Sequence, residues 1–185
     1  MDDLLAHGAR VDMVGAQFHI FRDEDFMRIV AGAEIIGRFP QTPEGIRRQF
    51  ALLGRSGRPV NLSEITIPAP GLTPEAMRQQ AVVAANLYRC WFSQPNACGI
   101  TWWHSLDGAS KDGGVENGSA GVMDAEGRPK PVYHALYDLI HRRWKTCVEA
   151  VAKDGKVTFR GFRGRYRISW QDAAKQNHSI QVELK

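Results

Sequence analysis

A single carboxylate, Glu64, interrupts a run of strand-forming residues between Pro59 and Pro68 (PVNLSEITIP). The apolar side chains of this run and the prolines that bound it are typical of a short strand buried on both faces. Because charged groups are rarely buried without a partner, we expect Glu64 at the carboxyl end of a parallel strand, where water, a substrate or a polar neighbour can reach it. A partly exposed glutamate on an edge strand is the simpler alternative.

Two other runs resemble strands and carry polar or aromatic groups near their ends. Residues 11–20 (VDMVGAQFHI) contain Gln17 and His19, which lie two positions apart and therefore point to the same face of a strand. A lone histidine on a strand more often has a structural role, and that alternative stays open. Residues 99–106 (GITWWHSL) place Trp102 and Trp103 on opposite faces.

Helix signals separate these strands. Thr42 and Thr73 each precede Pro-Glu, which is the pattern of a capping hydroxyl followed by proline in the first helical turn. A last amphipathic helix is expected over residues 131–143, and a long surface loop over residues 107–121, which are rich in Gly, Ser and Asp. Alternating strands and helices predict an α/β fold built from βα units around a parallel sheet.

The alternation of strands and helices ends near residue 145 and is followed by two stretches in which apolar residues recur at every second position. We therefore expect a first domain of residues 1–145 and a small basic β-strand appendage of residues 146–185. Residues 141–170 contain nine Arg or Lys and two acidic residues, and thus account for the net charge of +4. Basic and aromatic residues alternate in RGFRGRYR (160–167), but Arg163 and Gly164 depart from the RNA-recognition pattern. A solvated basic strand face is favoured, and no nucleic-acid partner is expected.

The composition, 43% hydrophobic and 24% charged, is that of a globular protein with a sizeable core. No apolar run approaches the ~20 residues of a membrane span, and the first twelve residues lack a signal-peptide profile. The three cysteines, Cys90, Cys98 and Cys147, have no C-x-x-C spacing and indicate neither a disulfide framework nor a zinc site. We therefore expect no metal, no cofactor and no membrane partner.

Three strand-and-loop signatures, VDMVGAQFH, PVNLSEITI and GITWWHSLDG, are followed in order by GVMDAEGRPKPVYHAL. Together they resemble the C-terminal part of glycoside hydrolase family 10, the retaining endo-β-1,4-xylanases, over roughly residues 2–143. The resemblance implies the sixth to eighth strands, with their helices, of a (β/α)₈ TIM barrel. It also implies a fragment, because the first five strands and the family's acid/base glutamate are absent.

The resemblance assigns a role to each candidate residue. Glu64 corresponds to the catalytic nucleophile, and His19 to the residue that orients it. Gln17, Trp103 and Trp102 are assigned to binding of a β-1,4-linked glycan such as xylan. Stacking of a sugar on an indole and attack of a carboxylate on the anomeric carbon agree with these roles.

Two positions depart from the family pattern: Thr66 replaces an aspartate that holds the histidine, and Lys111 replaces a second tryptophan. Without the acid/base carboxylate, we expect an O-glycosyl hydrolase fragment that is inactive alone and has the missing N-terminal half-barrel as a candidate partner. A noncatalytic carbohydrate-binding remnant is the alternative. The resemblance implies a secreted or periplasmic parent enzyme, whereas the localisation of this chain, its oligomeric state and the role of its appendage stay open.

Overall fold

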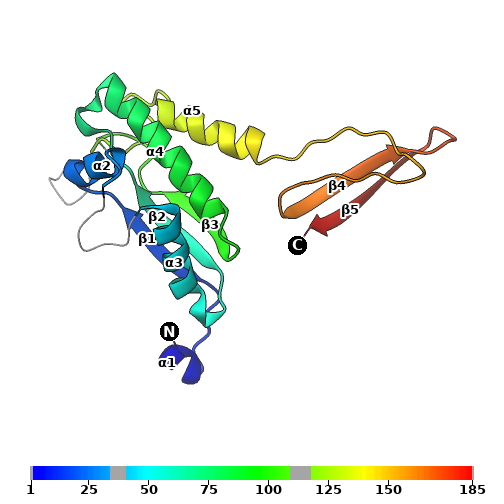
Figure 1. Cartoon of the computed structure of the whole chain (residues 1–185), viewed down its shortest axis with the longest axis horizontal. Coiled ribbons are helices and arrows are strands. Elements are labelled where there is room, and N and C mark those ends of the chain that lie inside the picture. The colour runs from blue at the N-terminus through cyan, green and yellow to red at the C-terminus, as the bar shows by residue number, and fades with distance from the viewer. Residues whose placement is uncertain (1, 34–40, 109–117, 185) are drawn as a thin grey trace. The chain divides into compact units, whose positions relative to one another are not determined.

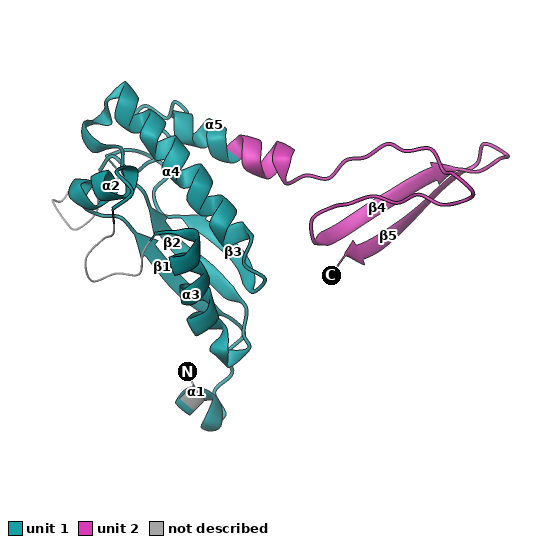
Figure 2. Ribbon diagram, viewed as in Figure 1, with its two compact units in different colours: residues 1–136 teal, residues 137–185 magenta. Residues whose placement is uncertain are grey.

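The computed structural model describes residues 2–33, 41–108 and 118–184. It divides the chain into two compact units, residues 1–136 and residues 137–185 (Figure 2). The division falls within α5, the last helix of the chain (Pro131–Asp138). The domain boundary predicted near residue 145 stays a prediction.

The first unit contains a three-stranded sheet in the order β1-β2-β3 (Figure 1). Its strands are β1 (Val14–His19), β2 (Val60–Thr66) and β3 (Ala97–Trp102), and both pairs are parallel. The predicted α/β class and parallel sheet are confirmed. Within the described ranges, the strands of this sheet do not close into a barrel.

Helices follow the strands as the sequence predicts. They are α1 (Asp2–Ala6), α2 (Asp23–Val30), α3 (Pro43–Leu53), α4 (Pro74–Phe92) and α5 (Pro131–Asp138), with short 3₁₀ turns at Gly54–Ser56 and Pro70–Leu72 and a π-helical turn at Leu139–Arg143. The predicted caps are confirmed, because Thr42 Oγ1 accepts from Gly45 N and Thr73 Oγ1 accepts from Ala76 N, both at 3.1 Å. Each cap satisfies one of the backbone donors that a helix start leaves unpaired.

Among the described residues, one face of the sheet carries most of the buried apolar side chains. Helices α3 and α4 lie over that face (Figure 1), and the Phe18 ring of β1 contacts Trp91 of α4 at 4.9 Å. The side chains buried with Phe18 are those of Val60, Leu62 and Ile65 in β2 and of Ile20, which directly follows β1. The other face carries Gly15 and Gln17, which are exposed, and Asn61 and Ser63, which are partly exposed. The prediction that the strand around Glu64 is buried on both faces holds at Ile65 and Thr66, which are both buried, but not at Asn61, Ser63 and Glu64, which are partly exposed.

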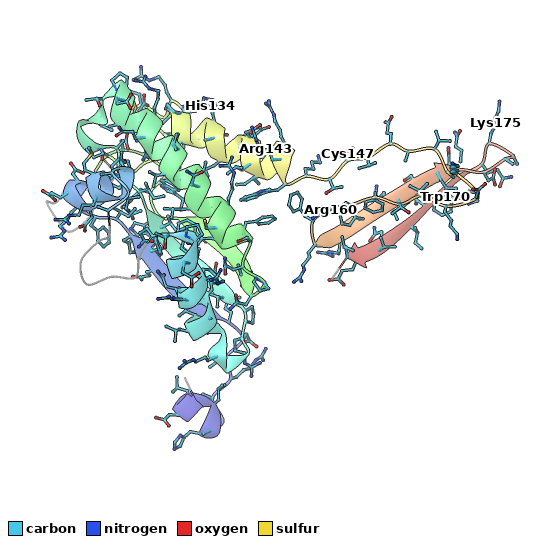
Figure 3. The ribbon with its side chains drawn as sticks, in the orientation of Figure 1. His134, Arg143, Cys147, Arg160, Trp170 and Lys175 are labelled. Carbon is cyan, nitrogen blue, oxygen red and sulfur yellow. The ribbon has the colours of Figure 1, made fainter. Side chains whose placement is uncertain are left out.

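The second unit contains a two-stranded antiparallel sheet formed by β4 (Gly164–Gln171) and β5 (Asn177–Leu184). The expected period-two strands are thus present. Ile168 pairs with Ile180, and Trp170 pairs with His178 and stacks on its ring at 5.4 Å. Figure 3 labels Trp170 near the turn that joins these strands. In the part of the chain that the structure describes, no helix has both the length and the apolar character needed to cross a membrane.

Candidate active site

An irregularity in β2 gives Glu64 its position. Ala16 of β1 pairs with Leu62, and Gln17 pairs with Glu64, so that Ser63 is an extra residue in β2. The pairing of β2 with β3 shifts in the same stretch. An extra residue bends a strand and redirects its side chains, and such bulges often lie beside functional sites. Ser63 and Glu64 are therefore both turned to the sheet face that carries Gln17.

The surroundings of Ser63 support this placement. Its hydroxyl donates to the Ala16 carbonyl at 3.3 Å. A β-carbon added to Gly15 would lie 3.5 Å from Ser63 Oγ, which places the serine on the face opposite the core. The alternation of β1 then puts Gln17 and His19 on the same face as Gly15.

Three side chains on this face form a connected chain. Glu64 Oε2 lies 3.2 Å from His19 Nε2, and His19 Nδ1 lies 2.8 Å from Thr66 Oγ1. The side chains of His19 and Glu64 are 9% and 23% exposed, and Thr66 is fully buried. An imidazole held at both nitrogens has one orientation, and it restricts the carboxylate beside it to few rotamers. Glu64 nevertheless keeps contact with solvent.

Aromatic rings border the histidine. Phe21 stacks on the imidazole with ring centroids 4.5 Å apart, and Trp103 meets it edge-on at 6.4 Å. Trp103 follows directly after β3 and is 44% exposed. An exposed indole beside a carboxylate can stack on the apolar face of a sugar ring while the carboxylate approaches that ring.

Trp102 has different surroundings. Its Nε1 donates to the Ala120 carbonyl at 2.8 Å, and its ring lies 6.4 Å from Tyr88 of α4. Burial raises the pKa of the Tyr88 phenol. The indole of Trp102 therefore packs between α4 and the segment after β3, on the side of the sheet away from Glu64. Its predicted role in substrate binding stays a prediction.

Four of the five predicted site residues meet at one end of the sheet. Gln17 and His19 lie at the end of β1, Glu64 lies in the second half of β2, and Trp103 follows β3. Because the strands are parallel, these positions are at their carboxyl ends, where α/β proteins bind ligands. Gln17 is exposed and faces Glu64 across the strand pair.

A buried ion pair, absent from the sequence-based prediction, holds the segment that follows Trp103. Lys130 Nζ donates to Asp107 Oδ1 at 2.9 Å and to the Ser119 carbonyl at 3.0 Å, and Gly121 N donates to the same Asp107 oxygen at 2.8 Å. The side chains of Lys130 and Asp107 are 2% and 4% exposed. Burial lowers the pKa of the Lys130 ammonium, and the hydrogen bond and charge of Asp107 oppose this shift.

Two predicted features fall outside the described ranges. Lys111, the position of the family's second tryptophan, lies outside the described residues, as does most of the loop predicted over residues 107–121. Among the residues that are described, no cluster of three or more His, Cys, Asp or Glu side chains is placed to hold a metal ion.

Comparison with protein families gives a match that covers the whole of the first unit and the three residues after it. The model of glycosyl hydrolase family 10 matches residues 1–139. The comparison with curated proteins found no match.

Solved structures with a similar fold include several xylanases. Native xylanase 10B from Thermotoga maritima is 23% identical with a TM-score of 0.56, and the match covers 76% of this chain and 40% of that one. Xylanase 10B from Thermotoga petrophila RKU-1, in complex with xylobiose, is 23% identical with a TM-score of 0.55, covering 76% and 39%. The endo-1,4-β-xylanase XylE from Penicillium canescens is 22% identical with a TM-score of 0.53, covering 74% and 38%. The chain thus spans 38 to 40% of the length of these enzymes, and the likeness concerns their fold.

Proposed function

Because the chain belongs to glycosyl hydrolase family 10, we propose that its first unit supplies the sixth to eighth strands of a (β/α)₈ barrel. Three parallel strands in chain order, with Gln17, Glu64 and Trp103 at their carboxyl ends, support this assignment. Active sites of such barrels lie at that end. The similarity in fold to xylanases agrees with it.

In this proposal Glu64 is the nucleophile of a retaining glycoside hydrolase. A carboxylate oxygen attacks the anomeric carbon, the bond from that carbon to the leaving oxygen breaks, and a second carboxyl group gives the leaving oxygen a proton. Water then attacks the glycosyl ester, loses a proton to the second carboxylate and releases Glu64. The observation that carries the proposal is the 3.2 Å contact between Glu64 Oε2 and His19 Nε2, which holds a solvent-accessible carboxylate in position.

The substrate in this proposal is a β-1,4-linked glycan such as xylan. Trp103 stacks on the sugar next to the cleaved bond, and the Gln17 amide hydrogen-bonds to its hydroxyl groups. Both side chains are exposed on the face that carries Glu64. In this proposal Trp102 contributes indirectly, because its hydrogen bond to the Ala120 carbonyl supports the chain from which Trp103 projects. The similar Thermotoga petrophila structure contains xylobiose.

The second carboxyl group of the reaction comes, we propose, from outside residues 1–139. Retaining enzymes hold their two carboxyl groups about 5 Å apart. Natural xylan has a sugar alkoxide as its leaving group, which needs a proton. The chain alone is then expected to leave xylan intact, and an N-terminal half-barrel that carries the acid/base residue is the partner expected to complete the site.

A substrate with an activated leaving group tests the role of Glu64. Dinitrophenolate departs with little help from an acid, so dinitrophenyl β-xylobioside is expected to glycosylate Glu64 without the second carboxyl group. Intact-mass spectrometry after incubation should show one added xylobiosyl group on the wild type and none on Glu64→Gln. Peptide mapping should place it on the β2 segment. An adduct on the Gln variant would show that another residue is the nucleophile.

A noncatalytic carbohydrate-binding protein is the second candidate, favoured by the 44% exposure of Trp103 beside the exposed Gln17. Calorimetry with xylo-oligosaccharides separates the two functions. If the protein only binds glycans, binding should survive Glu64→Ala, and no adduct should form even after addition of the missing half-barrel.

A further inference from the structure

Thr66 is fully buried, and its Oγ1 lies 2.8 Å from His19 Nδ1. The histidine connects it to Glu64 on the other side of the ring. Thr66 has no assigned role in the reaction proposed above. Its hydroxyl is also chemically different from the carboxylate that the family resemblance leads one to expect at this position, because a hydroxyl can donate as well as accept a hydrogen bond.

The direction of each hydrogen bond follows from the chemistry of the groups. An ionised Glu64 can only accept, so His19 Nε2 must carry the hydrogen of the 3.2 Å contact. In a neutral imidazole Nδ1 is then an acceptor. The atom 2.8 Å from Nδ1, Thr66 Oγ1, must in that case donate. The neutral form with hydrogen on Nδ1 is excluded, because it would set a lone pair against the carboxylate.

Among the residues that the structure describes, two uncharged aromatic side chains border the imidazole ring. Phe21 stacks on one face of the imidazole and Trp103 meets it edge-on, and neither side chain titrates. Thr66 itself is uncharged and fully buried, and the histidine side chain is 9% exposed. Burial in general disfavours a charged imidazole, whereas a hydrogen bond to a carboxylate such as Glu64 favours it.

We propose that Thr66 is a positioning residue that donates its hydroxyl hydrogen to His19 Nδ1, so that a neutral His19 presents Nε2–H to Glu64. An aspartate at position 66 could not donate, and it would require a hydrogen on both ring nitrogens to make the same two contacts. The chain thus differs from the expected family pattern in the charge of its histidine as well as in one side chain.

The effect on the reaction rests on the proposed function. Nε2–H can remain a donor to the same glutamate oxygen when Glu64 is a carboxylate and when it is a glycosyl ester. His19 therefore keeps its hydrogen through both steps, and Thr66 keeps the ring from rotating when the negative charge on Glu64 disappears. A small displacement of a reacting group lowers a rate by about 10- to 100-fold, which sets the scale expected for loss of this support.

Nitrogen NMR of the full chain at pH 8, above the ordinary titration range of histidine, tests the hydrogen-bond arrangement directly. The wild type, labelled with ¹⁵N-histidine, should show one protonated and one hydrogen-bonded unprotonated ring nitrogen for His19. His19→Gln identifies these signals among the six histidines by removing them. Thr66→Val should move the Nδ1 signal toward that of a nitrogen without a donor, and Thr66→Ser should restore it. Thr66→Asp should protonate both nitrogens.

The same variants are then compared by their rates of labelling with dinitrophenyl β-xylobioside. Thr66→Val should react about 10- to 100-fold more slowly than the wild type, and Thr66→Ser within a few-fold of it. A doubly protonated or Nδ1-protonated wild-type ring would overturn the inference, as would an Nδ1 signal that Thr66→Val leaves in place. Equal labelling rates would refute the positioning role. A wild type that is not labelled would contradict the proposed function, while the NMR spectra would still decide the arrangement of Thr66 and His19.

Discussion

Lys130 and Asp107 form an ion pair with 2.9 Å between Nζ and Oδ1, and both side chains are almost completely buried. The pair joins the segment after β3 to the residue that directly precedes α5. The same segment contains Ala120, whose carbonyl accepts the Trp102 hydrogen bond. The ion pair therefore supports the backbone from which Trp103 projects, although it lies outside the site itself.

Removing one charge of this pair should lower the free energy of unfolding more than removing both charges does. Lys130→Met or Asp107→Leu alone leaves an unpaired charge in the core, and each is expected to lower the free energy of unfolding by about 3–5 kcal/mol. The double variant should cost clearly less than the sum of the two, as measured by urea unfolding followed by tryptophan fluorescence. Additive losses in this cycle would mean that the two charges do not act as a pair.

Gly121 is expected to tolerate no side chain. A β-carbon there would lie 2.3 Å from Asp107 N and 2.6 Å from the Met123 carbonyl oxygen, and neither backbone atom can move aside easily. Gly121→Ala should therefore destabilise the protein by about 1–3 kcal/mol, the usual cost of overpacking. Gly118→Ala is the matched control, since its nearest contact would be 4.0 Å away. Similar melting temperatures for the two variants would contradict the close approach seen at Gly121.

Some of these features were predictable from the sequence and others were not. Helix starts at Thr42 and Thr73 depend on adjacent residues, and local sequence was sufficient to predict them. The bulge at Ser63 also has a local signal, because the buried apolar positions change from even to odd numbers after Leu62. Reading residues 59–68 as one continuous buried strand overlooked that change of phase.

Contacts between residues far apart in the chain have no such local signal. Thr66 is 47 residues from His19, and Lys130 is 23 residues from Asp107. Neither spacing is a helical or strand repeat, so only the folded sheet brings the members of each pair together. The family resemblance supplied His19 and Glu64, but it placed a different residue at position 66 and therefore could not supply the observed hydrogen bond.

The two adjacent tryptophans should respond differently to truncation. Trp103→Ala is expected to weaken xylo-oligosaccharide binding by roughly 10-fold, about 1.4 kcal/mol, with little change in stability, because its exposed ring stacks on sugar in our proposal. Trp102→Ala should lower the free energy of unfolding by about 3 kcal/mol, because it removes packing and a hydrogen bond to Ala120. Calorimetry and thermal melting of both variants make the comparison. A stability loss confined to Trp103→Ala would reverse the assignment.

The turn of the second unit should be sensitive to acid. Asp172 Oδ2 lies 2.9 Å from His178 Nε2, and its Oδ1 accepts from the backbone amides of Ala174 and Gln176. The hydrogen bond from His178, followed by those backbone donors, lowers the pKa of the Asp172 carboxyl below its ordinary value.

A carboxyl whose pKa is lowered by folding stabilises the folded form above the unfolded-state pKa of about 3.9, and the stabilisation disappears as the pH falls through the folded-state pKa. Amide NMR of β4 and β5 between pH 6 and pH 2 should therefore show increasing loss of the turn's amide protection below about pH 4. Asp172→Asn should flatten this dependence. An unchanged pH profile in that variant would exclude Asp172 as the cause.

Hydrolysis of the glycosyl ester on Glu64 is the second half of the proposed reaction. Once dinitrophenyl β-xylobioside has glycosylated Glu64, hydrolysis needs a base that takes a proton from water, and we propose that residues 1–139 do not provide it. The adduct should therefore persist.

Azide carries no proton to be removed, so it can attack the anomeric carbon directly, break the bond to Glu64 and return the carboxylate. Adding azide should release the adduct and yield β-xylobiosyl azide, with the configuration of the original substrate, as detected by NMR and mass spectrometry. Chloride at the same ionic strength is the control and should leave the adduct intact. Rapid turnover in buffer alone, or hydrolysis of xylan by the unpartnered chain, would show that the chain carries its own acid/base group.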